Sequence, residues 1–106
     1  MRYSVILVPD ETGRVSVTVP ALPGCVSVGA TTEEALAHVR EAIHGWLETE
    51  ALAGNRPPVE TPDMVGHGVA LALETIEEMR EAGEYPFERG YELEVTTVEV
   101  RPPVAA

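Results

Sequence analysis

The sequence predicts an α+β domain. We expect a three-stranded, largely antiparallel sheet with an amphipathic helix packed on one face, followed by a second helix and a C-terminal strand. Strand-like alternation fills the first 29 residues, and two long segments with helical spacing follow. The 106 residues fit one domain, and a hydrophobic content of 44% is enough for a core without disulfides or metal ions.

Three predicted strands are joined by short connections. Residues 2–9 have apolar side chains on both faces, which indicates a strand covered on both sides or one at a subunit contact. A turn ending in Gly13 leads to residues 14–20, where valines alternate with polar residues and complete a hairpin. A loop with two prolines then precedes a short strand at residues 26–29. These connections favour antiparallel pairing.

The first predicted helix begins after Thr31 and ends near Leu52. Thr31 and Glu34 have the spacing of a capping box. Gly54, followed by a proline pair, is a typical helix end. The apolar stripe consists of Ala35, Leu36, Val39, Ala42, Ile43, Trp46 and Leu47. This stripe needs a surface to cover, and the three-stranded sheet is the one available upstream.

The second half of the chain predicts a helix and a strand. A proline-rich connector at residues 55–63 precedes a helix at about 68–82, and residues 85–90 form a turn. Residues 91–100 form the last strand, in which the apolar parity changes midway, indicating a bulge or a strand shared between two neighbours. We expect both helices on one face of the sheet, or the second helix extended toward another subunit.

The charge balance limits the possible partners. Eighteen acidic residues oppose seven arginines, there is no lysine, and the formal net charge is -11. Such a chain repels phosphate backbones, whereas a basic protein is attracted to it. The alternative is that the acidic residues only keep the protein soluble. The lone Cys25, the absence of a secretory signal and the lack of a long apolar run predict a cytoplasmic protein with no membrane contact.

Two histidines of the first predicted helix have spacings that indicate a metal site or surface pairs. His38 lies four residues after Glu34 and three before Glu41, which could form a weak metal site on one helix face. No HExxH or paired-cysteine motif supports it, so we interpret this face as solvated. We expect His44 to pair with Glu48 on the surface.

The remaining candidates also favour structural roles. Cys25 is expected to be a small buried residue, because no adjacent base would activate its thiol. His67, between two glycines, is expected in a flexible approach to the second helix. Trp46 is expected to anchor the core or an interface. Asp10 and Glu11 fall in a turn, so they do not form a two-metal nuclease site. We therefore predict no catalytic, metal-binding or cofactor-binding residues and no cofactor; the partner-binding residues remain unidentified.

An ordered series of segments resembles the HicB-like antitoxin domain. It covers residues 3–58, about half of the chain. The series is Tyr3-Ser4-Val5-Ile6-Leu7, an acidic turn ending at Gly13, Val17-Thr18-Val19-Pro20, Leu22-Pro23-Gly24-Cys25, Gly29, the helix start Thr31-Thr32-Glu33-Glu34-Ala35, and Trp46-Leu47 before a proline pair. The order is more specific than any one motif. A single HicB-like domain would then span residues 1–106, with a core at 1–58 and a helix–strand extension at 64–101.

The resemblance implies a truncated ribonuclease-H-like fold that has lost its catalytic residues. It also implies an antitoxin, not an enzyme, that binds a small basic HicA-type toxin, an mRNA-cleaving ribonuclease, and hides its catalytic histidine. Many such antitoxins add a C-terminal DNA-binding element. Here the only basic residues from 59 to 100 are Arg80 and Arg89, which argues against direct DNA binding. We also expect the chain to form a homo-oligomer, a dimer or tetramer. The alternative function is an orphan family member that assembles with itself as a structural or regulatory protein, without toxin or DNA.

Overall fold

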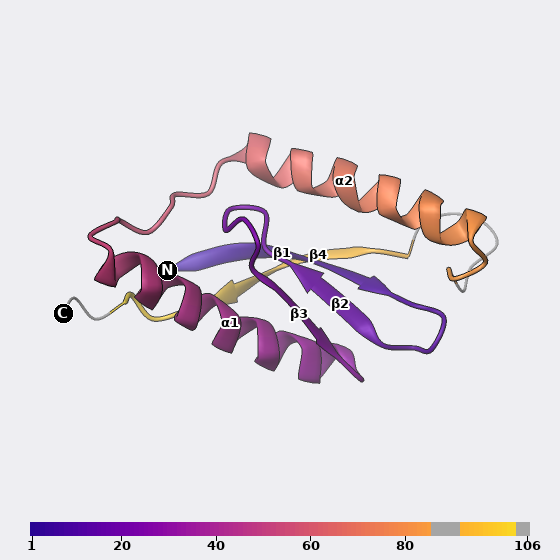
Figure 1. The fold of residues 1–106 in the computed structure, drawn as a ribbon, viewed down its shortest axis with the longest axis horizontal. Coiled ribbons are helices and arrows are strands. Elements are labelled where there is room, and N and C mark those ends of the chain that lie inside the picture. Colours follow the sequence, from indigo (N-terminus) through magenta and orange to yellow (C-terminus); the bar gives the residue numbers. More distant parts are fainter. Residues whose placement is uncertain (86–91, 104–106) are drawn as a thin grey trace.

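The computed structural model describes residues 1–85 and 92–103. Within them, four strands form one sheet flanked by two long helices, so the predicted α+β fold is confirmed (Figure 1). The elements are β1 (Arg2–Pro9), β2 (Val15–Thr18), β3 (Val26–Gly29), α1 (Thr32–Leu52), α2 (Pro62–Glu81) and β4 (Glu94–Glu99). The predicted turn beyond Tyr85 and the predicted strand start at Tyr91 lie outside the described residues.

The sheet is antiparallel throughout, with strand order β3-β2-β1-β4. The C-terminal strand therefore joins the same sheet, beside β1. Its register with β1 is continuous, so the predicted bulge is absent. The change in apolar parity has another cause: Val98 pairs opposite Tyr3 on one face of the sheet, and Val95 pairs opposite Ile6 on the other. The strand thus contributes apolar side chains to both faces.

The main core lies between α1 and one face of the sheet. The predicted alternation in β2 is confirmed, because Val15, Val17 and Val19 are buried there. From α1, the buried side chains are Ala35, Val39, Ile43 and Leu47, with Leu36, Ala42 and Trp46 packed at the margin. The predicted helix ends are also confirmed. Thr31 Oγ1 accepts a hydrogen bond of 3.1 Å from the Glu34 backbone N–H, and Gly54 has φ +83° after the last turn.

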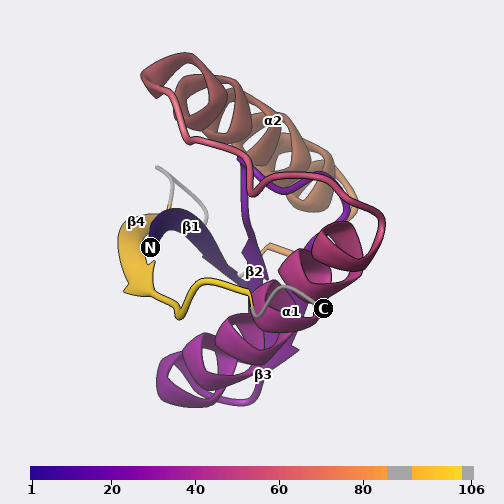
Figure 2. The same ribbon diagram turned by 90° about the vertical axis from the view of Figure 1, so that its left-hand side faces the viewer.

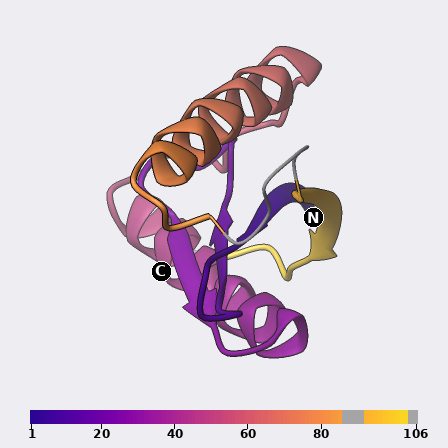
Figure 3. The ribbon, with the colours of Figure 1, turned by 90° about the vertical axis from the view of Figure 1, so that its right-hand side faces the viewer.

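The two helices cover opposite faces of the sheet, so the expectation that both share one face is wrong. Figures 2 and 3 show α1 on one side of the strands and α2 on the other. α2 packs against β1. The physical reason is the doubly apolar pattern of β1: Ile6 points away from the main core and is only 1% exposed, so its face needs a cover of its own. Of the two readings of β1, a strand covered on both sides is confirmed.

α2 begins six residues earlier than predicted, at Pro62. Thr61 supplies the cap, because its Oγ1 accepts a hydrogen bond of 3.3 Å from the Met64 backbone N–H, and proline suits the first helical turn. Gly68, which indicated a helix start, instead permits close packing inside the helix. A Cβ at this position would lie 2.7 Å from Pro20 Cγ and 3.1 Å from Ile6 Cδ1. The glycine therefore lets α2 approach the sheet.

The connector between the helices is fastened to β1. The Glu60 carboxylate accepts hydrogen bonds from the Ser4 backbone N–H at 2.6 Å and from Ser4 Oγ at 2.8 Å. The Tyr3 hydroxyl donates to the Pro58 carbonyl at 2.7 Å. These bonds fall on β1 just before the first residue paired with β2, Ile6, so they satisfy polar groups that the sheet leaves free there. The start of α2 is thereby held close to β1.

The buried hydroxyl of Tyr3 should make the protein less stable at alkaline pH. Burial raises the pKa of the Tyr3 hydroxyl above 10.0, and the Glu60 charge raises it further. A raised folded-state pKa gives stability that is complete below the unfolded pKa and is lost as pH rises through the folded one. The free energy of unfolding should thus fall above about pH 10 in the wild type, and less steeply in Tyr3→Phe. Urea titrations of both proteins across this range measure the difference; parallel pH curves would contradict it.

Candidate partner-binding groove

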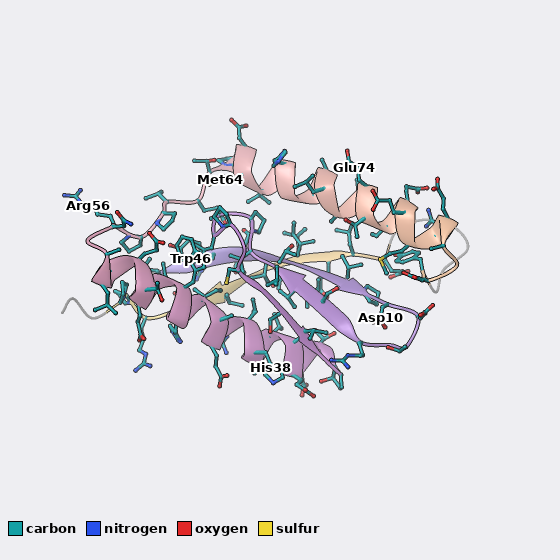
Figure 4. The ribbon with its side chains drawn as sticks, viewed as in Figure 1. Asp10, His38, Trp46, Arg56, Met64 and Glu74 are labelled. Carbon is teal, nitrogen blue, oxygen red and sulfur yellow. The ribbon has the colours of Figure 1, made fainter. Side chains whose placement is uncertain are left out.

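An apolar groove of about 480 Å³ runs between α2 and the face of the sheet opposite α1. We call this face the outer face. Figure 4 shows side chains from both elements pointing into the space between them. The apolar lining residues are Ile6, Val8, Val19, Pro20, Leu22, Pro23, Cys25, Val26, Met64, Leu71, Ala72 and Met79. The polar side chains in the lining are Ser16, Thr18, His67 and Thr75. We call this surface the α2 groove.

The groove exists because α2 lies over β1 and leaves the outer face of β2 and β3 open. On β3, Val26 is 61% exposed and Val28 is 39% exposed. On α2, Leu71 is 49% exposed and Met64 is 37% exposed. Large apolar side chains from two elements thus face solvent along the same side of the molecule. Clustered exposed apolar residues of this kind mark interaction surfaces in soluble proteins.

Carboxylates lie on the solvent side of α2, outside the groove lining but close to it along the helix. Glu74 and Glu78 follow Leu71 by three and seven residues, so helical spacing places them beside the groove-facing side chains. Figure 4 shows Glu74 on the side of α2 that points away from the sheet. The whole chain adds to this field, since its net charge is -11. The surface therefore combines an apolar floor with an acidic flank, which suits a basic and partly apolar protein partner.

The predicted metal candidates are not gathered into a site. His38 Nδ1 lies 2.8 Å from the Val28 carbonyl oxygen, and His38 Nε2 lies 3.9 Å from Glu34 Oε1 (Figure 4). Within the described ranges, 1–85 and 92–103, no group of three histidine, cysteine or acidic residues could hold a metal ion. The His38 ring is instead hydrogen-bonded to the Val28 carbonyl of β3, the edge strand. This bond holds α1 against the edge of the sheet.

The other predicted candidates have structural positions. Cys25 is 5% exposed, and burial raises the pKa of its thiol, which favours the unreactive protonated form. Trp46 packs against the core and donates from Nε1 to the Pro23 carbonyl at 3.0 Å, so its role as an anchor is confirmed. The expectation for His67 is wrong: it lies within α2 and lines the groove, because that helix begins at Pro62.

Asp10 and His44 each hold a local segment in place. Asp10 Oδ1 accepts hydrogen bonds from Thr12 and from the Arg14 backbone N–H, which lower the pKa of its carboxyl and hold the β1–β2 turn. The His44 Nε2 atom accepts a 3.3 Å hydrogen bond from the Arg101 backbone N–H. His44 thus fastens the segment after β4 to α1, a contact that its spacing from Glu48 did not indicate.

Sequence patterns alone did not identify the groove residues. Two signals were present, namely the second apolar face of β1 and the pair of valines in β3. Neither predicts a groove without the position of α2.

Among the residues described, neither helix combines the length and apolar composition needed to cross a bilayer.

A family profile described as "HicB_like antitoxin of bacterial toxin-antitoxin system" matches residues 3–70, which is more than half of the chain. This chain belongs to the HicB-like antitoxin family. The match extends beyond the resembling segment into the first half of α2, so the family profile includes most of the groove. The resemblance found in the sequence is therefore confirmed.

Relatives and solved structures agree with this membership. A UPF0150 protein of Thermoplasma acidophilum is 49% identical over 49 residues, covering 46% of this chain and 71% of the relative. A UPF0150 protein of Archaeoglobus fulgidus is 36% identical over 50 residues, covering 47% and 72%. The N-terminal domain of the Burkholderia pseudomallei antitoxin HicB is 26% identical, with a TM-score of 0.57 and coverage of 94% of this chain and all of that domain. The longer HicB antitoxin structure is 25% identical, with a TM-score of 0.55 and coverage of 93% and 64%.

Proposed function

We propose that this HicB-like protein is a cytoplasmic antitoxin that binds and masks a small basic HicA-type mRNA-cleaving toxin. It acts by binding, without catalysing a reaction. The observation that supports the proposal is the α2 groove, an exposed apolar surface with carboxylates nearby on the solvent side of α2, in an acidic chain of the antitoxin family. Apolar contact supplies affinity, and opposite charge steers the basic toxin into place.

Co-expression with the small gene adjacent to the antitoxin gene tests the proposal. If the neighbour encodes a basic protein, the two should co-purify, and cell growth stopped by the toxin alone should recover. Raising the salt concentration during capture should slow association, because the steering is electrostatic. A basic neighbour that is never captured, and whose toxicity persists in the presence of the folded chain, would contradict masking.

Operator binding is not part of the proposed function. Arg80 is one of the two basic residues between 59 and 100, and its guanidinium lies 2.6 Å from Glu77 Oε1 and 5.1 Å from the centre of the Tyr85 ring. Both contacts draw the cation back onto the protein and away from a phosphate. A mobility-shift assay with the protein's own promoter DNA should show no specific complex.

Self-assembly without a toxin is the second candidate. The outer strand β3 favours it, because Val26 and Val28 are exposed and the strand contains no charged residue. A second copy could add its own β3 to this edge and form a dimer or tetramer. Light scattering tests this candidate: a strict monomer across the micromolar range would exclude self-assembly.

A further inference from the structure

We infer that the α2 groove binds an amphipathic helix of the basic partner, with apolar side chains on the groove floor and Lys or Arg beside α2. The inference rests on the proposed function, which it deepens by naming the structure of the bound segment. It follows from the length of the groove, the polar groups that the groove lacks and the charge beside it.

The shape of the groove fits a helix. The lining follows α2 from Met64 to Met79, about 22 Å at a rise of roughly 1.5 Å per residue. A helix of about four turns laid along this length presents apolar residues at positions i, i+3, i+4 and i+7 to one surface. The groove floor provides matching apolar contacts from β3, from the loop after β2 and from α2.

The polarity of the lining selects a helix over an extended strand. An extended segment has unpaired N–H and C=O groups that must find partners when buried. Twelve apolar residues line the groove against four polar side chains, which are too few to pair with all the backbone groups of a buried extended segment. The nearby edge of β3 is partly occupied as well, since His38 bonds the Val28 carbonyl. A helix satisfies its own backbone and needs only side-chain contact.

Charge selects a basic partner over a second copy of the chain. Glu74 and Glu78 lie outside the groove lining on the solvent side of α2, three and seven residues after Leu71, so a second α2 packed along the groove would bring like charges near each other. Two chains of net charge -11 also repel each other before contact. Lys or Arg on one flank of a bound helix would instead pair with these carboxylates.

A peptide probe tests the groove separately from the toxin. The probe is a fluorescent 15-residue helix with leucine at the four anchor positions and lysine on one flank, and binding is measured by anisotropy. We expect Leu71→Asp and Val26→Asp to weaken binding roughly tenfold or more. The matched control is Leu52→Asp, which makes the same charge change at a residue that is 74% exposed and outside the groove. An added carboxylate attracts the basic probe, so a loss of binding reports lost apolar contact.

Two further probes test the form and charge of the ligand. A peptide of the same composition with the leucines in β alternation, and a helical peptide with glutamate replacing lysine, should each bind at least about tenfold more weakly. The inference is overturned if the groove variants bind the first probe as Leu52→Asp does, if the wild type binds none of the helical peptides, or if the alternating peptide binds best. It is also overturned if light scattering shows a wild-type dimer that Leu71→Asp dissociates, because a second copy then fills the groove.

The toxin experiment distinguishes failure of the groove from failure of the function. If the wild type and Leu71→Asp both capture the toxin, masking stands and the groove inference falls. If the wild type captures no toxin but binds the basic helical probe through Leu71 and Val26, the groove stands and toxin masking falls.

Discussion

Replacement of Gly29 by alanine is expected to destabilise the protein by about 3 kcal/mol. A Cβ at this position would lie 2.3 Å from the Ala35 backbone nitrogen and 2.7 Å from Ala35 Cα. The clashing atoms belong to the first turn of α1 and cannot rotate away as the end of a side chain can. β3 and α1 must separate to relieve the overlap, and the main core between them is then opened.

Urea denaturation followed by circular dichroism measures this loss, and Gly45→Ala is the matched control. Gly45 lies on α1, and a Cβ there would meet nothing within 4 Å. Alanine at this helical position should raise the free energy of unfolding by about 0.5–1 kcal/mol, because alanine favours the helix. An unchanged denaturation midpoint for Gly29→Ala would show that β3 and α1 are not packed as closely as described.

Ile76→Ala is expected to cost about 2–4 kcal/mol and to loosen α2 in particular. Ile76 is fully buried, and it lies outside the main core, as does Ile6 on the outer face of β1. It is the one residue of α2 that is completely buried, so truncation leaves a cavity under a helix with few other anchors. The α2 groove should lose its wall, and binding of a basic partner should weaken with it.

Hydrogen exchange separates this local effect from general unfolding. Amide exchange should accelerate in α2 while α1 stays protected, because the two helices rest on different faces of the sheet. Leu71→Ala is the control: this leucine is 49% exposed, so its removal should change stability by less than about 0.5 kcal/mol. Equal acceleration in both helices would contradict a separate packing of α2.

The local elements could be predicted because their signals lie within a few residues of one another. The valine alternation in β2, the Thr31 cap of α1 and the Gly54 helix end each act through neighbouring backbone groups. The α2 start could not be predicted in this way. Gly66 and Gly68 weaken the helical pattern locally, and only the closeness of Pro20 and Ile6 explains the glycine at 68.

Composition, strand alternation and helix ends were enough to predict an acidic α+β chain. The family followed from something else, the resemblance of an ordered series of segments, which the family profile bears out. The face on which α2 packs, and hence the groove, depended on contacts between residues more than fifty positions apart, such as Ser4 with Glu60 and Ile6 with Gly68. Short-range patterns show that β1 has two apolar faces but not what covers the second one. Only the folded chain brings α2 over part of that face and leaves the rest open for a partner.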